Sequence, residues 1–322
     1  MTDSAPYFAD LAAGPPGGHA RWCHADDGTR LRAVIWPVTD AKGTVLILPG
    51  RTEHAEKYGR TAAELAQRGY ASIALDWRGQ GLSDRLLPDR RIGHVARFAD
   101  YQRDLDAFVS LLGTTDLPGP RFMLAHSMGG AIGLRALIRG VAVRAAVFSA
   151  PMWGILVPRG QQRLFEALTR GAQLLGLGTR YAPPPATGPA SYVQTAPFAD
   201  NSLTTDPEMF AEMKRHFDRE PDLLVAGPSL QWLHEALAEC RALRLCPSPA
   251  VPALAAIGSR ERVVDTGAVV QRMQRWPGGQ LLKVEGAEHE MLMETPDIKA
   301  LFLDSCVTFF ANSDLAAASE GV

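Results

Sequence analysis

Three residue types that could together carry out acyl transfer stand at separate points of the chain: a serine, a histidine and a carboxylate. Ser127 lies in "LAHSMGG" (124–130), and His289 lies in "EGAEHEMLMETP" (285–296). A serine hydroxyl attacks an acyl carbon well only when a base takes its proton, and an acid must orient that base. The set therefore predicts nucleophilic catalysis, with Ser127 as nucleophile and His289 as general base.

Two carboxylates compete for the role of the acid. The segment "GSRERVVD" (258–265) follows a predicted strand and contains Glu261 and Asp265. Glu261 stands nearer the end of that strand, where its side chain can reach an active site. Asp265 stands just before a predicted helix, in the position of an N-cap. Glu261 is favoured, and Asp265 remains the alternative.

The segment around Ser127 resembles the nucleophile elbow G-x-S-x-G, but its first glycine is replaced by Ala125. The elbow places the serine on a strained turn between a strand and a helix. We expect Ala125 to end the strand in ordinary extended geometry and the strain to fall on Ser127. The alternative is a serine that only caps the following helix.

Acyl transfer also needs two donors for the oxygen that becomes negative. One is expected to be the backbone amide of Met128, directly after the serine. The other is expected from Arg51, in the loop after the apolar run "TVLILPG" (44–50). The Arg51 side chain suggests a further hypothesis, that its guanidinium meets a phosphate headgroup.

Strand and helix patterns alternate in the segments that must position these residues. A hairpin is predicted at 19–38, because the turn Asp27-Gly28 separates two β-rich runs. Strands are predicted at 43–50, 70–77, 121–126, 144–151, 251–259 and 279–287, and the main helices between and after them at 58–69, 100–112, 128–140, 266–276 and 297–311. This order predicts an α/β fold with a mainly parallel, doubly wound sheet.

The alternation stops between residues 153 and 245, where only helical patterns appear. We expect an α/β core at 19–152 and 246–312, a helical cap inserted at 153–245, a flexible arm at 1–18 and a flexible tail at 313–322. The ends of the insertion adjoin neighbouring strands, which favours a cap over an independent domain.

Substrate preference should depend on this cap. Four residues are candidates to line an acyl pocket: Trp153, Trp232, Leu164 and Leu168. The simpler interpretation is that they pack the cap onto the core. For the leucine-rich stretch 164–177, the alternative is a lipid-facing surface.

Composition limits the partners. The formal net charge of −2 provides no field for nucleic acid. The four cysteines show no metal-ligand spacing. Catalysis by a serine, a histidine and a carboxylate requires neither a metal nor an organic cofactor, so none is expected. With neither a signal-peptide pattern nor an apolar run of about 18 residues, we expect a cytoplasmic protein. Peripheral contact with the inner face of the membrane through the cap remains open, and the sequence does not indicate an oligomeric state.

With these residues in place, the chain resembles the monoacylglycerol lipase and lysophospholipase branch of the α/β-hydrolase fold, and within it the bacterial lysophospholipase L2 type. The resemblance rests on "LPGRTEHAEKYGR", "LDWRGQGLSDR", "LAHSMGGAIG", "GSRERVVD" and "EGAEHEMLMETP". It implies a catalytic triad of Ser127, Glu261 and His289, oxyanion amides at Arg51 and Met128, and a helical cap. The chain departs from the family pattern at two positions. Pro49 stands where histidine is more common, and Glu261 stands where aspartate is more common.

The function expected is hydrolysis of carboxylic esters of single-chain lipids, lysophospholipid or monoacylglycerol, through an acyl-enzyme on Ser127. A carboxylesterase or thioesterase for small soluble acyl substrates is the alternative, since the same residues would serve it. A non-catalytic ligand-binding protein on this fold is the remote alternative.

Overall fold

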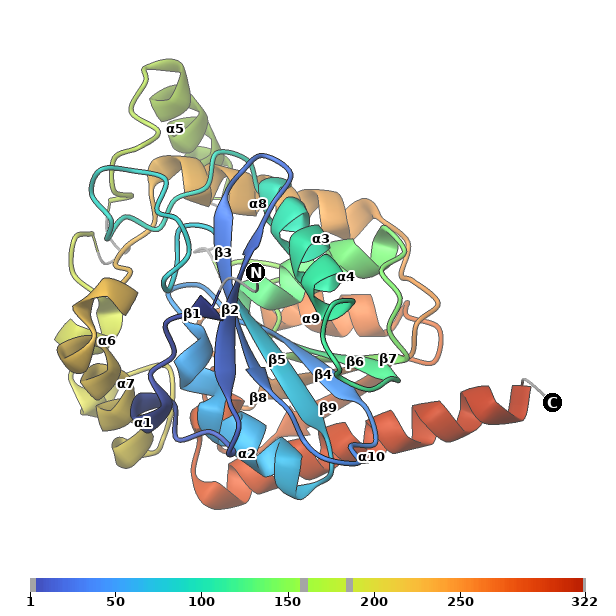
Figure 1. Cartoon of the computed structure of the whole chain (residues 1–322). Coiled ribbons are helices and arrows are strands. Elements are labelled where there is room, and N and C mark those ends of the chain that lie inside the picture. Colours follow the sequence, from blue (N-terminus) through green and yellow to red (C-terminus); the bar gives the residue numbers. More distant parts are fainter. Residues whose placement is uncertain (1–3, 157–161, 184–187, 321–322) are drawn as a thin grey trace.

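The computed structural model describes residues 4–156, 162–183 and 188–320, and these form one nine-stranded sheet flanked by helices (Figure 1). The strand order is β1-β2-β3-β5-β4-β6-β7-β8-β9. The strands are β1 Ser4–Ala5, β2 His19–His24, β3 Arg30–Trp36, β4 Thr44–Leu48, β5 Ala71–Asp76, β6 Arg121–His126, β7 Ala145–Ser149, β8 Ala253–Gly258 and β9 Gln280–Val284. From β5 to β9 all neighbours are parallel, while β1, β2 and β3 join in antiparallel pairs. The predicted α/β class is confirmed.

Helices cover both faces of the sheet, as right-handed crossovers between parallel strands require (Figure 1). The helices of the core are α2 Gly59–Gln67, α3 Asp100–Leu112, α4 Met128–Ile138, α9 Thr266–Met273 and α10 Pro296–Glu320. Helices α2 and α10 lie on one face, joined by an ion pair of 2.7 Å between Lys299 and Glu64. Helices α3 and α4 pack together on the other face.

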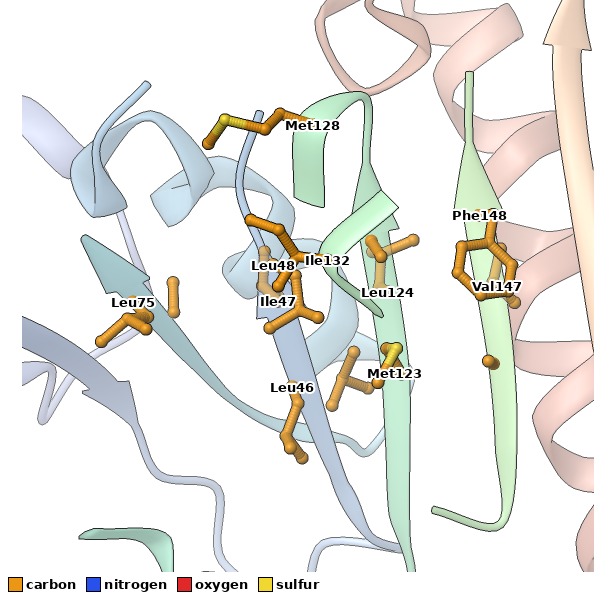
Figure 2. Packing of buried hydrophobic residues seen from close by; sticks show 14 of the residues in the cluster. Leu46, Ile47, Leu48, Leu75, Met123, Leu124, Met128, Ile132, Val147 and Phe148 are labelled. Carbon is orange, nitrogen blue, oxygen red and sulfur yellow. The ribbon is translucent and has the colours of Figure 1, made fainter. Parts of the chain in front are cut away.

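The apolar core forms because the central strands are buried along their whole length. Every residue of β4 and of β7 is buried, which is why their sequences are continuous apolar runs and not alternating patterns. Figure 2 shows Ile47 and Leu48 of β4 close to Leu124 of β6, with Ile132 of α4 packed over them. This packing fixes the strand ends from which the site is built.

The chain between β7 and β8 is helical in its described part. Its helices are α5 Gln162–Leu174, α6 Tyr192–Thr195, α7 Pro207–Arg219 and α8 Leu230–Leu245, with the 3-10 turns η2 Phe198–Asp200 and η3 Pro221–Leu223. Helix α8 packs against α4, whereas α5 projects from the molecule (Figure 1). A second apolar cluster joins α6 and α7 to Leu11 and Met293, outside this segment.

Two expectations about the chain ends are wrong. Residues 4–18 are not a loose arm: β1 pairs with β2, and the short helix α1 Ala9–Ala12 buries Leu11 against α7. The helix-breaking glycines and prolines of 14–18 misled the prediction because they follow these elements. At the other end, α10 continues through residues 313–320, where a tail was expected.

Four leucines of α5 and its following turn whose side chains are described do not pack onto the core as the simpler interpretation held. Leu168, Leu174, Leu175 and Leu177 are 57%, 82%, 76% and 43% exposed. Helical periodicity alone placed them on one side of a helix but could not show what that side faces. Among the described residues, no helix is long and apolar enough to cross a membrane.

The loop after β5 is held by buried ion pairs. Asp76 accepts hydrogen bonds from Arg32 Nε at 2.8 Å and from the Ala55 amide at 2.7 Å. Arg78 is paired with the buried carboxylate of Asp104 at 2.7 Å. These contacts fasten "DWRGQGLSD" beneath the loop that carries Arg51, so the conspicuous charges of this motif are structural.

Candidate active site

Ser127 occupies a sharp turn between β6 and α4. Its backbone angles are φ 49° and ψ −115°, a conformation that is strained for a residue with a side chain. The turn needs glycine next: a Cβ on Gly129 would lie 2.1 Å from the Leu48 carbonyl oxygen, and one on Gly130 would lie 2.6 Å from Pro151. Ala125 stays in β6 with an extended backbone, as expected. The strain therefore falls on the serine, at the carboxyl edge of the sheet.

His289 lies between Ser127 and Glu261 in space, although each comes from a different loop. Its Nε2 is 3.0 Å from Ser127 Oγ, and its Nδ1 is 2.8 Å from Glu261 Oε2. Although burial opposes it, the charge of His289 lowers the pKa of Glu261, so this carboxylate is ionised at neutral pH. It therefore accepts a hydrogen bond from Nδ1–H, which leaves the lone pair of Nε2 free to take the proton of the serine.

The two carboxylates of the loop after β8 have different surroundings. Glu261 Oε1 also accepts hydrogen bonds from the amides of Val263 and Val264, at 2.6 and 3.1 Å, which fix its orientation. Asp265 caps α9 by accepting from the Ala268 amide at 3.3 Å. Of the two candidates, only Glu261 makes a hydrogen bond with His289 among the described contacts.

The loop between β4 and the 3-10 turn η1 (Ala55–Tyr58) holds Arg51 in place from both sides. The Gly50 amide donates to Glu53, and the Thr52 amide donates to Gln80 Oε1 at 2.9 Å. Gln80 Nε2 in turn donates to the Gly50 carbonyl at 3.0 Å. Met128 is the first residue of α4, so its amide has no acceptor within the helix.

A buried ionic cluster supports these loops, formed by Glu53, Lys57, His126 and Glu290. Lys57 Nζ lies 2.8 Å from Glu290 and also contacts Glu53, while His126 Nε2 lies 3.2 Å from Glu290. Although burial opposes it, Lys57 and His126 lower the pKa of Glu290 well below its usual range. The cluster ties the Arg51 loop to the residues next to Ser127 and His289.

This cluster also contains a set of donors with metal-binding spacing, Glu53, His126 and Glu290. Lys57 already contacts both carboxylates, so a lysine ammonium balances their charge. Sequence reasoning missed the cluster, because it considered this loop only as the source of the oxyanion donor at Arg51. The spacing of four residues between Glu53 and Lys57, on either side of a helix start, was the available signal.

A cavity of about 330 Å³ opens beside Ser127 and His289. Its lining is mostly apolar and comes from both the core loops and the helices between β7 and β8. The apolar lining residues include Met152, Ile155, Val193, Leu203, Met213, Phe217, Leu233, Val263 and Met293. Two histidines in the wall, His54 and His216, are joined by a contact of 2.8 Å between their rings.

Of the four predicted pocket residues, one belongs to the described lining of the cavity. Trp232 lines the cavity. Trp153 does not belong to the described lining: its indole N–H donates to the Gly130 carbonyl at 3.0 Å, and its ring packs against Phe148. Leu168 is exposed on α5 and is likewise absent from the described lining. The side chain of Leu164 lies outside the described residues.

The sheet topology, the elbow at the end of β6 and the histidine after β9 define an α/β-hydrolase. Comparison with known proteins agrees. Residues 39–296 match the family described as serine aminopeptidase, S33. The chain belongs to this family.

Curated relatives narrow the branch, and a solved structure shares the fold. The chain is 35% identical over 299 residues to lysophospholipase L2 of Escherichia coli, covering 88% of this chain and 85% of that protein. It is 28% identical to human monoglyceride lipase, with 84% of each chain covered. A crystal structure of a soluble variant of Saccharomyces cerevisiae monoglyceride lipase with a substrate analog has a TM-score of 0.72 at 19% identity, covering 96% of this chain and 99% of that one.

Proposed function

We propose that this protein is a serine ester hydrolase whose substrates are single-chain lipid esters, lysophospholipid or monoacylglycerol. The observation that carries the proposal is the 3.0 Å contact between His289 Nε2 and Ser127 Oγ at the wall of a mainly apolar cavity. The names of the relatives, lysophospholipase and monoglyceride lipase, support this class of substrate.

In the proposed mechanism, Ser127 Oγ attacks the ester carbonyl carbon while His289 Nε2 takes its proton. Glu261 holds the Nδ1–H and stabilises the imidazolium that results. The amides of Arg51 and Met128 donate to the oxyanion of the tetrahedral intermediate. As the intermediate collapses, His289 returns the proton to the leaving alcohol. Water, deprotonated by His289, then attacks the acyl carbon, and His289 returns that proton to Ser127 Oγ as the fatty acid is released.

The same residues would also serve a carboxylesterase or thioesterase for small acyl groups, and chain length discriminates these functions. A series of p-nitrophenyl esters from acetate to palmitate, together with a lysophospholipid and a monoacylglycerol, should show kcat/KM rising with chain length. The reason is that the cavity offers apolar side chains along its wall. A maximum at acetate would favour the soluble substrates.

A fluorophosphonate probe tests whether the protein is catalytic at all. We expect the wild-type protein to be labelled and Ser127→Ala to remain unlabelled, because the probe reacts only with an activated serine. Folded wild-type protein that resists the probe would favour the ligand-binding alternative.

We further propose that α5 and its following turn contact a membrane surface, at the cytoplasmic face. Leu168, Leu174, Leu175 and Leu177 are exposed together, and basic Arg170 lies among them. Sedimentation with vesicles of phosphatidylglycerol and phosphatidylethanolamine should fall when Leu174 and Leu175 are both changed to serine. Leu245→Ser, at an equally exposed leucine on α8, is the matched control. Equal losses in both variants would reject α5 as the contact.

A further inference from the structure

Arg51 carries a charge into the cavity without a carboxylate partner. Its guanidinium has one described hydrogen bond, from Nη1 to the Ala226 carbonyl oxygen at 3.1 Å. It also lies 5.4 Å from the centre of the Trp232 ring, in cation–π contact. Among the described residues, no carboxylate forms an ion pair with it.

The other basic groups of the cavity wall differ from Arg51. Lys57 is paired with Glu53 and Glu290. His126 faces Glu290 at 3.2 Å, and His289 faces Glu261 at 2.8 Å. Burial, together with the charge of nearby cations, lowers the pKa of His216 to about 4, and burial also lowers that of His54, so both rings are neutral at neutral pH. Burial lowers the pKa of Arg51 to about 10, which still leaves it charged. Within the described lining, Arg51 is therefore the cation that is left unbalanced.

An unbalanced cation in the wall of a mainly apolar cavity is costly unless something pairs with it. A guanidinium has five N–H donors, arranged to bind two oxygens of a carboxylate or phosphate side by side. Arg51 uses one of them on Ala226, and the ring of Trp232 limits its movement. Its remaining donors suit an anion that enters the cavity from solution.

We propose that the Arg51 side chain binds the phosphate of the substrate headgroup and thereby selects lysophospholipids over monoacylglycerols. This inference rests on the proposed ester hydrolase function. In a lysophospholipid the ester and the phosphate are attached to the same glycerol unit. In the proposed mechanism the Arg51 amide receives the ester oxygen, and the same residue lines the cavity with a guanidinium that donates to the Ala226 carbonyl. One residue thus meets both ends of the glycerol unit.

This inference is tested by comparing two substrates in the same detergent micelles. The quantity measured is the ratio of kcat/KM for palmitoyl-lysophosphatidylcholine to kcat/KM for monopalmitoylglycerol. Arg51→Gln should lower the ratio by about 10- to 100-fold, the usual effect of losing a charged hydrogen-bond donor. The fall should come mainly from KM for the phospholipid. Arg51→Lys, which keeps the charge, should restore part of it. Every variant retains the backbone amide of residue 51. Damage to the oxyanion site would lower kcat/KM for both substrates together and leave the ratio constant.

Arg85→Gln is the matched control. Arg85 is a second arginine whose pKa burial lowers to about 10, but it donates to the carbonyls of Gly79, Gly81 and Asp222 and does not belong to the described lining. Its variant should keep the wild-type ratio. A ratio unchanged by Arg51→Gln would overturn the proposal, and inhibition by inorganic phosphate in that case would indicate a site for free phosphate.

A binding measurement separates failure of this inference from failure of the proposed function. In a Ser127→Ala background, an ether-linked lysophosphatidylcholine should bind about 10-fold or more weakly after Arg51→Gln, as measured by isothermal titration calorimetry. If Arg51→Gln left the affinity for this lipid unchanged, the phosphate site would be rejected, whether or not the wild-type protein hydrolyses esters. Selective binding without hydrolysis would reject only the ester hydrolase function.

Discussion

The two walls of the cavity are built on different principles. The core-side wall consists of the loops after β4, β6, β8 and β9, and apart from Arg51 the charges described there are paired: Lys57 with two carboxylates, and His289 with Glu261. The helical wall consists of α6, α7 and α8, and it presents mainly apolar side chains such as Val193 and Phe217. Paired charges hold groups in fixed directions, whereas apolar contacts set volume and shape. The comparison suggests that the core-side wall provides the chemistry and the helical wall the choice of acyl chain.

The largest effect should come from the acid of the core-side wall. Glu261→Gln should reduce kcat on a short p-nitrophenyl ester by about 10³- to 10⁴-fold, because a neutral amide neither fixes the tautomer of His289 nor stabilises its cation. Steady-state kinetics with a circular dichroism check of folding measure this. A loss below about 10-fold would remove Glu261 from the proposed triad.

The next effect concerns the stability of the ionic cluster. Lys57→Met should lower the free energy of unfolding by about 3–5 kcal/mol, since it leaves Glu53 and Glu290 buried without their cation. Urea titration measures the loss. Arg60→Met is the control, because Arg60 pairs with Glu212 from a side chain that is 47% exposed and should cost below about 1 kcal/mol. Similar costs for both variants would show that the cluster is not a rigid support.

A buried histidine of the helical wall should make the free energy of unfolding depend on pH. His216 of α7 has its pKa lowered from 6.5 to about 4 by burial and nearby cations, so the unfolded chain takes up the proton first. The neutral His216 ring contributes about 1–3 kcal/mol to the free energy of unfolding. This contribution is fully present above pH 6.5 and is lost as the pH falls through about 4. His216→Gln should flatten this dependence in urea titrations at several pH values. The exposed His24→Gln should keep the wild-type slope; if it flattens equally, the assignment fails.

Much of the core-side wall could be predicted from sequence because its rules are local. The run Thr44–Leu48 indicates a strand buried on both faces, and a loop after such a strand must reach the carboxyl edge of the sheet. Chain order then placed Ser127, Glu261 and His289 at that edge. The glycines after Ser127 are required by the turn itself, so the motif carries its own geometry.

The rest depends on contacts between segments far apart in the chain. Lys57 meets Glu290 across more than two hundred residues, and no spacing in the sequence reports that pairing. The apolar residues of α5 had the periodicity of a packed helix, yet Leu174 and Leu175 face outward. Whether Arg51 has a partner likewise depends on which carboxylates the fold places nearby, since the residue type alone does not determine it.

The smallest expected effect sharpens the choice between the two carboxylates after β8. Asp265→Ala removes the cap of α9 and should lower the free energy of unfolding by about 1 kcal/mol. Because the Asp265 side chain orients a helix and Glu261 orients His289, kcat should change by less than about 3-fold, against the loss of about 10³-fold or more for Glu261→Gln. Kinetics on the same ester, with Asp265→Asn as the variant that retains a capping side chain, measure the difference. If Asp265→Ala instead lost activity as Glu261→Gln does, while Asp265→Asn kept the stability but not the rate, the acid of this site would be Asp265. The hydrogen bond between Glu261 and His289 would then be a resting-state contact.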